Sequence, residues 1–192
     1  MTMKSLLEAV QPIQKLNITR DIITEDGPFP NNGLLPILHY QLAIQLSNDN
    51  DGDMVREILE TNGWTNSWID GIFDYHHYHS TAHEVLVALK GSAHLQLGGP
   101  NGIPLTFSRG DVIIIPAGVA HIKVNDADGF LCLGAYPDGQ QYDMKYGRQD
   151  ERPGADENIR KVPLPQCDPL YGDDGPLLLN WASAGDHTRT VL

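Results

Sequence analysis

Between residues 71 and 136, short apolar or alternating runs follow one another at close spacing, with glycine-containing turns between them. This region constrains the fold most, because short runs bounded by turn formers are typical of strands rather than helices. The six runs cover residues 72–79, 84–89, 93–97, 111–115, 121–124 and 130–136. The turns include residues 98–102, 109–110 and 126–129. This pattern predicts an all-β fold, either a sandwich or a small antiparallel β-barrel.

The sequence on either side predicts two extensions that belong to the same structural domain. Residues 1–60 form an N-terminal extension, in which an apolar stretch predicts an early strand at 34–46 and capping residues predict short helices at 5–10 and 53–62. Residues 61–137 form the core of the domain. Residues 138–192 form a C-terminal wrap, whose polar stretch at 148–157 predicts a solvated loop.

The charge balance excludes two classes of partner. The 192 residues include 13 Lys and Arg against 25 Asp and Glu, which gives a net charge of −12. Nucleic acid and anionic membranes would be repelled, so we expect neither as a partner. No apolar run approaches the ~20 residues of a membrane span, and Glu8 interrupts the N-terminal stretch, which makes it a poor signal peptide. We expect a soluble, cytoplasmic protein.

The two cysteines are not expected to form a disulfide framework or a zinc site. Cys132 and Cys167 are too few for a disulfide framework, and their spacing matches no zinc motif. Cys132 lies in an apolar run, where a small buried hydrophobe is the expected role. A chain of this length can bury a sizeable core without cross-links.

Four of the eight histidines lie in one window of eight residues: His76, His77, His79 and His83. In a strand, successive side chains point to opposite faces, so His77 and His79 share a face and His76 faces away. A turn at residues 80–82 would bring the next strand back alongside and place Glu84 across from the two imidazoles. His121 offers a third imidazole.

Three imidazoles and one carboxylate are a donor set for a divalent metal ion. They suit Fe(II), Mn, Zn, Ni or Cu, and no thiolate imposes a softer choice. Four protein ligands on an octahedral ion leave two positions for water, substrate or dioxygen. On spacing alone, the alternative is that these histidines are structural or lie on the surface.

Two stretches around these residues resemble the two conserved motifs of the cupin superfamily. They read Gly71-x5-His77-x-His79-x4-Glu84-x6-Gly91 and Gly110-x5-Pro116-x-Gly118-x2-His121-x3-Asn125. The resemblance implies the cupin double-stranded β-helix, a small antiparallel β-barrel with the metal inside it. Carried over residue by residue, it implies one divalent metal ion, Fe, Mn, Zn or Ni, held by His77, His79, Glu84 and His121.

A narrower resemblance, to the YjlB-type single-domain cupins, covers most of residues 29–181. It rests on residues 62–64, 68, 71–73, 75–80, 134–137 and 162–169. That group is largely uncharacterised. The resemblance therefore implies the fold and leaves the reaction open.

Three residues near the expected ligands are candidate catalytic groups. His83 would orient a ligand or act as an acid–base group. Tyr75 shares the ligand face, where it would either contact the ligands or pack. Lys123 is in phase with the third histidine, where it would either neutralise a carboxylate substrate or lie in solvent. Trp64 and Trp68 are expected to be core anchors.

The leading functional hypothesis is a mononuclear metalloenzyme that acts on a small polar organic molecule. Dioxygenase, decarboxylase and isomerase chemistry all fit a Lewis-acidic ion with open positions. The alternative is a non-catalytic cupin that binds or senses a small molecule. We also expect a homodimer, because the early apolar residues 34–44 would pair with an edge strand of a neighbouring copy.

Overall fold

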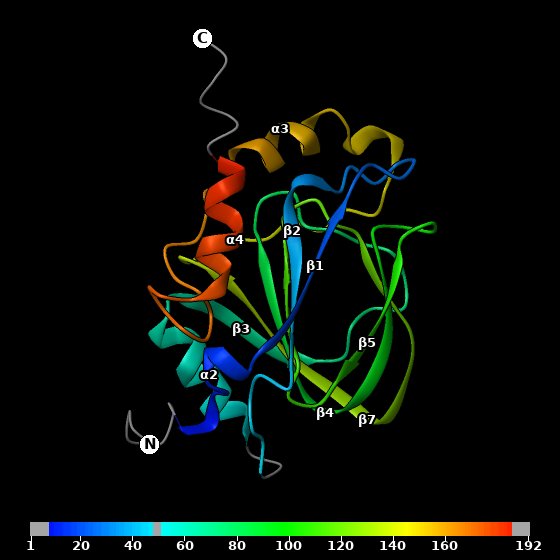
Figure 1. Cartoon of the computed structure of the whole chain (residues 1–192). Helices are drawn as coiled ribbons and strands as arrows, with labels where there is room; N and C mark the ends of the chain where they lie inside the picture. Colours follow the sequence, from blue (N-terminus) through cyan, green and yellow to red (C-terminus); the bar gives the residue numbers. More distant parts are fainter. Residues whose placement is uncertain (1–7, 48–50, 186–192) are drawn as a thin grey trace.

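Antiparallel strands form the body of the protein (Figure 1). The computed structural model describes residues 8–47 and 51–185, and in these ranges seven strands form one sheet. The strands are β1 (Asn17–Ile23), β2 (Asn32–Gln41), β3 (Trp64–Asp70), β4 (Glu84–Leu97), β5 (Ile103–Ser108), β6 (Val112–Ile115) and β7 (His121–Pro137). The helices are η1 (Ile13–Lys15), α2 (Asp51–Thr61), η2 (Gln149–Glu151), α3 (Gly154–Lys161) and α4 (Pro176–Gly185).

The long strands β4 and β7 hold the sheet together. The strand order is β1-β2-β6-β4-β7-β3, and β5 pairs with β4 outside this path. The first part of β4 pairs with β6 and β7, whereas its second part pairs with β5 and β7. The pairing with β7 shifts register around Gly91, whose φ is +63° and whose added Cβ would lie 2.3 Å from the Ala127 carbonyl oxygen. Glycine therefore permits the bend that curves the sheet into a barrel.

Alternation along β4 separates two apolar clusters. Val85 and Val87 pack in an outer cluster with residues of α2 and α4, which lie along one side of the barrel (Figure 1). Leu86 and Ala88 belong to an inner cluster between the curved strands. Glu84 is in phase with the inner residues and is buried. The strand that secures the outer core thus also delivers a carboxylate to the barrel interior.

The predicted all-β fold is confirmed, but several predicted strands have different bounds. The runs at 84–89 and 93–97 are one strand, β4, and those at 121–124 and 130–136 are one strand, β7. The strand expected at 34–46 is β2. Residues 72–79 form no regular strand and make only isolated bridges, at His77 and Tyr78. Strands β1, β3 and β5 were not predicted, because polar residues and Pro104 interrupt their apolar pattern.

The predicted solvated loop at 148–157 is wrong over most of its length, because residues 149–151 form η2 and residues 154–161 form α3. Acidic residues in the first turn of α3 and Arg160 and Lys161 in its last turn complement the helix dipole. The helix predicted at 53–62 matches α2. Of the helix predicted at 5–10, residues 5–7 lie outside the described residues.

The C-terminal segment is anchored to β2. The Asp168 carboxylate accepts hydrogen bonds from the Tyr40 hydroxyl (2.8 Å) and the Leu177 backbone N–H (3.0 Å). The Trp181 indole donates to the Pro36 carbonyl oxygen (2.9 Å). Buried polar groups paired in this way fix the end of the chain on the barrel.

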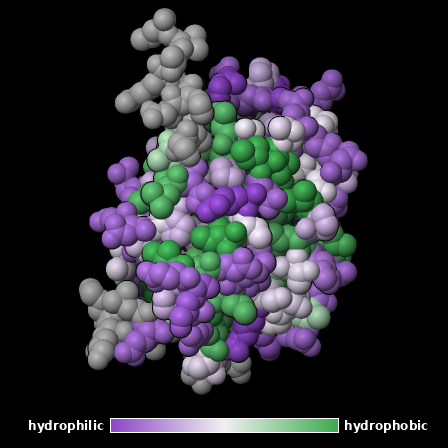
Figure 2. All heavy atoms as spheres, viewed as in Figure 1, coloured by the Kyte–Doolittle hydropathy of each residue, from purple (hydrophilic) through white to green (hydrophobic). Residues whose placement is uncertain are grey.

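Strand β2 is not available for pairing with another chain. It lies between β1 and β6, so the edge-pairing reason for a homodimer is wrong, although the dimer itself stays a prediction. Hydrophilic residues alternate with hydrophobic patches on the face seen in Figure 2. No helix in the described part of the chain has the length and apolar character to cross a membrane.

Candidate metal centre

The connection from β3 to β4 carries two histidines to the start of β7. The backbones of His77 and His121 exchange both N–H···O hydrogen bonds, at 3.2 and 2.9 Å. The His79 carbonyl accepts a hydrogen bond from the Gly118 N–H at 2.8 Å. Gly118 has φ +94°, and an added Cβ would lie 2.6 Å from the Asn31 carbonyl oxygen. A tight turn that requires glycine thus brings the two sequence motifs together.

Three imidazoles converge inside the barrel, where His77, His79 and His121 are only 4, 5 and 2% exposed. One ring nitrogen from each lies within 4.8 Å of the other two. The other ring nitrogen, Nδ1, lies beside a backbone carbonyl oxygen, that of Tyr75, Asp143 or Val119 in turn, at 2.6–3.2 Å. A carbonyl oxygen only accepts, so each Nδ1 must donate, and each neutral ring then has its lone pair on Nε2. The tautomers that suit metal binding are therefore set by the backbone.

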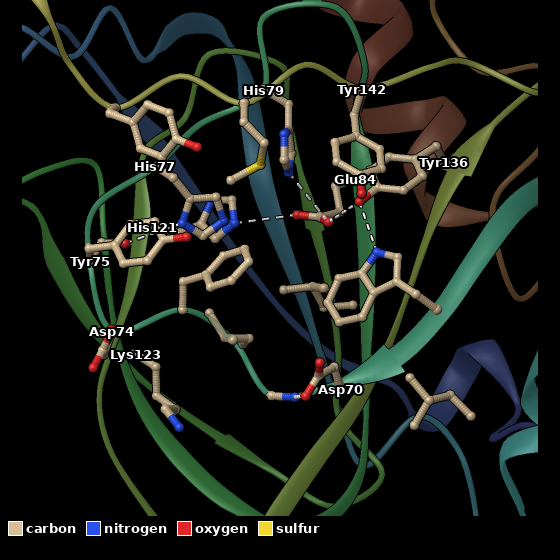
Figure 3. A pocket seen from close by; sticks show the side chains of 18 residues that line it. Asp70, Asp74, Tyr75, His77, His79, Glu84, His121, Lys123, Tyr136 and Tyr142 are labelled. Carbon is tan, nitrogen blue, oxygen red and sulfur yellow. Dashed lines mark hydrogen bonds and ion pairs between the residues drawn. The ribbon is translucent and has the colours of Figure 1, made fainter.

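Glu84 contacts two of these imidazoles (Figure 3). Its Oε1 lies 3.6 Å from Nε2 of His79, and its Oε2 lies 3.4 Å from Nε2 of His121. Oε2 is buried and has no hydrogen-bond partner among the described residues. A carboxylate oxygen facing lone pairs without a donor is unfavourable unless a cation or proton lies between them. The donor set therefore fits a divalent cation.

The electrostatics of the cluster depend on burial and on the carboxylate. Burial and the neighbouring His121 lower the pKa of His77 to about 3. Burial also disfavours charge on His79, but the adjacent Glu84 carboxylate outweighs it and raises the His79 pKa. Burial disfavours the charged form of Glu84 as well, yet His79 and His121 hold its pKa below its usual range. A negative charge is thus kept at the centre of the cluster.

A hydrogen-bonded chain fixes the orientation of Glu84. The Tyr136 hydroxyl donates to Oε1 of Glu84 at 2.9 Å (Figure 3). The Trp68 indole N–H donates to the Tyr136 hydroxyl oxygen at 2.9 Å. The indole lies against Gly134, its pairing partner on β7, where an added Cβ would lie 2.3 Å from ring carbons of Trp68. Oε1 is therefore occupied, and Oε2 is the free oxygen.

A cavity of about 650 Å³ opens above the imidazoles. Its wall comes from the end of β3, the following connection, the start of β4, both ends of β7 and the segment after β7. Two of the three candidate catalytic residues, Tyr75 and Lys123, line it. Desolvation and the nearby Tyr146 and Asp74 raise the pKa of Tyr75, so its hydroxyl stays protonated. Lys123 forms an ion pair with Asp126.

The third candidate, His83, does not line the cavity. It is buried, its Nδ1 accepts a hydrogen bond from the Ala117 N–H (3.0 Å), and its ring packs on Trp181 with 4.7 Å between centroids. Burial lowers its pKa to about 3. The structure thus places His83 as a neutral acceptor that holds the turn before His121, away from the open cavity.

Sequence reasoning missed Tyr136 and Asp143 and the contribution of Trp68 to the cavity. Trp64 is a core anchor as predicted, and Trp68 packs against the inner cluster but also lines the cavity. Asp143 holds His79 through its carbonyl oxygen and accepts hydrogen bonds from the N–H and hydroxyl of Ser80 (both 2.6 Å). The alternation of β7, with Ala135 in the outer cluster, is the signal that would have pointed Tyr136 inward.

Comparisons with known proteins agree with this geometry. The model of the Cupin family matches residues 74–142. The uncharacterized protein YjlB of Bacillus subtilis (strain 168) is 44% identical over 157 residues, which cover 82% of this chain and 92% of YjlB.

Solved structures match more distantly. Acireductone dioxygenase from Bacillus anthracis, with a cadmium ion in its active centre, has a TM-score of 0.38 and 15% identity, covering 50% of this chain and 64% of that chain. A point mutant of oxalate decarboxylase from Bacillus subtilis has a TM-score of 0.35 and 17% identity, covering 58% of this chain and 27% of that chain. Structural similarity at this level does not indicate which reaction, if any, this chain catalyses.

Proposed function

This chain belongs to the cupin family, whose YjlB-type members it resembles over most of its length, and we propose that it is a mononuclear metalloenzyme acting on a small polar organic molecule. The proposed ligands of one divalent ion are His77, His79, Glu84 and His121. The observation that carries the proposal is the convergence of three buried imidazoles beside a carboxylate oxygen without a hydrogen-bond partner. A bound divalent ion would supply a Lewis acid that polarises substrate oxygen atoms.

The protein's own residues have separate tasks in this proposal. The backbone carbonyls hold the three rings in the Nδ1-protonated form, so that no tautomer change accompanies binding. Tyr136 keeps Glu84 in one rotamer. The Tyr75 hydroxyl, whose pKa is raised, stays protonated and is available to donate a hydrogen bond to a ligand in the cavity. The reaction types that we propose are dioxygenase, decarboxylase or isomerase chemistry.

The second candidate function is a non-catalytic cupin that binds or senses a small molecule. It is favoured by the position of His83, which removes the strongest acid–base candidate from the cavity. The side chains that remain there, Tyr75 and Lys123, are a weak acid and a cation already paired with Asp126.

Elemental analysis followed by activity assays separates these functions. Protein purified without chelator should contain about one equivalent of Fe, Mn, Zn or Ni. Oxygen uptake and product formation are then measured with a panel of small acids, sugars and thiols. Turnover that disappears in His121→Ala and survives in His94→Ala supports an enzyme, since His94 lies on β4 outside the cavity. Stoichiometric metal with ligand binding and no turnover supports the sensing function.

A further inference from the structure

Four of the side chains that line the cavity are exposed aromatic rings. Phe73, Tyr75, Tyr142 and Tyr146 are 48, 41, 44 and 39% exposed, and all four line the cavity. Within residues 8–47 and 51–185, every other Phe, Tyr and Trp side chain is less exposed than these four. Exposed aromatic surface concentrated at one cavity marks a binding surface rather than random surface composition. We name these four residues the aromatic rim.

The rim is held in place before any ligand arrives. Phe73 and Tyr75 stack with 4.8 Å between centroids and 20° between planes, and Tyr146 lies 6.0 Å from Tyr75. Tyr142 stacks on the buried Tyr136 at 4.5 Å and 22°. Because these rings are already ordered, a ligand that stacks on them loses little free energy to immobilising side chains. Flat, preordered aromatic faces favour a flat partner.

The charges on the wall disfavour an anionic ligand. Asp70 and Asp74 line the cavity in addition to the buried Glu84, and lie apart from it in the lower part of Figure 3. The one Lys or Arg side chain among its described lining residues is Lys123, and its charge is neutralised by Asp126. A divalent ion beside Glu84 would keep part of its positive charge and would attract an anion at the bottom of the cavity. On the wall, however, a dicarboxylate would meet two like charges and no unpaired basic side chain.

The dimensions also argue for a ligand larger than a small acid. A volume of about 650 Å³ lies within the range of cavities that hold drug-sized organic molecules. The imidazoles at the bottom are almost fully buried, whereas the rim is half exposed. The cavity thus offers aromatic surface on its solvent-exposed side, and a diacid of a few carbon atoms would leave most of this surface uncovered.

We propose that this cavity binds an uncharged, planar ring compound with hydroxyl or carbonyl substituents, in preference to a small dicarboxylate. The inference deepens the proposed function, on which it rests, by naming the ligand class of the same site. The rim supplies ring contacts, and the substituents reach the polar bottom of the cavity.

Calorimetric titration of the Zn²⁺-loaded protein at pH 7 without oxygen tests this preference. Catechol is planar and uncharged at this pH, whereas oxalate is a dianion, and both offer two oxygen atoms to a cation. Catechol should bind at least tenfold more tightly. The double variant Phe73→Leu/Tyr75→Leu should lose about fivefold in catechol affinity, the size expected for a lost ring–ring contact. Leu131→Ala, exposed on β7 outside the cavity, is the control and should change nothing.

The outcomes separate this inference from the proposed function. Zinc content is measured for each variant, so that loss of the metal site is not mistaken for loss of ring binding. Tyr146→Leu provides a second rim variant, farther along the chain from the histidines. Equal or tighter binding of oxalate, or unchanged catechol binding in the rim variants, overturns the inference while leaving metal binding intact. If no metal binds, the proposed function fails. The inference about the ligand is then tested by the same titrations on metal-free protein, which must still show tighter binding of catechol than of oxalate.

Discussion

Substitution of Gly134 with alanine should weaken the metal site without touching a proposed ligand. The added Cβ would lie 2.3 Å from two ring carbons of Trp68 and 2.7 Å from its indole nitrogen, so the ring has to move. Overpacking of this kind costs about 1–3 kcal/mol, and the lost hydrogen bond to Tyr136 adds about 0.5–1.5 kcal/mol. We expect the free energy of unfolding to fall by about 1.5–4.5 kcal/mol in metal-free protein.

Metal affinity should fall as well, by roughly tenfold, because Tyr136 then holds Glu84 less firmly. Denaturant unfolding and metal titration measure the two effects. Gly33→Ala is the matched control, since its added Cβ meets only Thr24 Cγ2 at 3.8 Å. In a Trp68→Ala background the cost of Gly134→Ala should largely vanish. If Gly134→Ala is as stable as Gly33→Ala and binds metal normally, the role assigned to the Trp68–Tyr136 pair is wrong.

The site and its surroundings can be probed in three other ways. Glu84→Ala should lose metal, but its metal-free form should melt at nearly the same temperature as metal-free wild type. Val87→Ala should retain metal and lose roughly 1–3 kcal/mol of stability. If metal-free Glu84→Ala melts far below metal-free wild type, the carboxylate serves the fold. Glu84 raises the pKa of His79, so protons begin to compete with the metal for His79 at a pH above the ordinary imidazole pKa of ~6.5. Metal affinity should therefore fall as the pH decreases from 8 to 5. An affinity that does not change over this range contradicts imidazole ligation. Light scattering should return a homodimer, and a monomer mass at high concentration counts against it.

Patterns local in the sequence predicted the parts of the fold that depend on local order. Alternation from Glu84 onward predicted that Val85 and Val87 face away from the carboxylate, and the two clusters have this arrangement. The match of residues 71–125 to both cupin motifs named the residues that the structure brings together. Helix α2 was predicted from its apolar stripe and its flanking residues.

Features set by long-range pairing were not predictable in this way. Trp68 and Tyr136 are 68 positions apart, and their hydrogen bond depends on the register of β3 against β7. That register needs Gly134 to be small, which no local pattern indicates. His83 lies in the same sequence window as the metal-site histidines, but its Nδ1 accepts a hydrogen bond from the backbone N–H of Ala117, a turn residue. Spacing along the chain does not distinguish these two environments.

Metal titration of chelator-stripped protein tests the central claim most directly. Wild type should bind one equivalent of Zn²⁺ or Mn²⁺, and His77→Ala, His79→Ala and His121→Ala should each lose most of the affinity. His94→Ala, an exposed histidine on β4, should bind as wild type does. Affinity that persists in all three variants, or that disappears equally in His94→Ala, would contradict the assignment of the three buried imidazoles as the metal site.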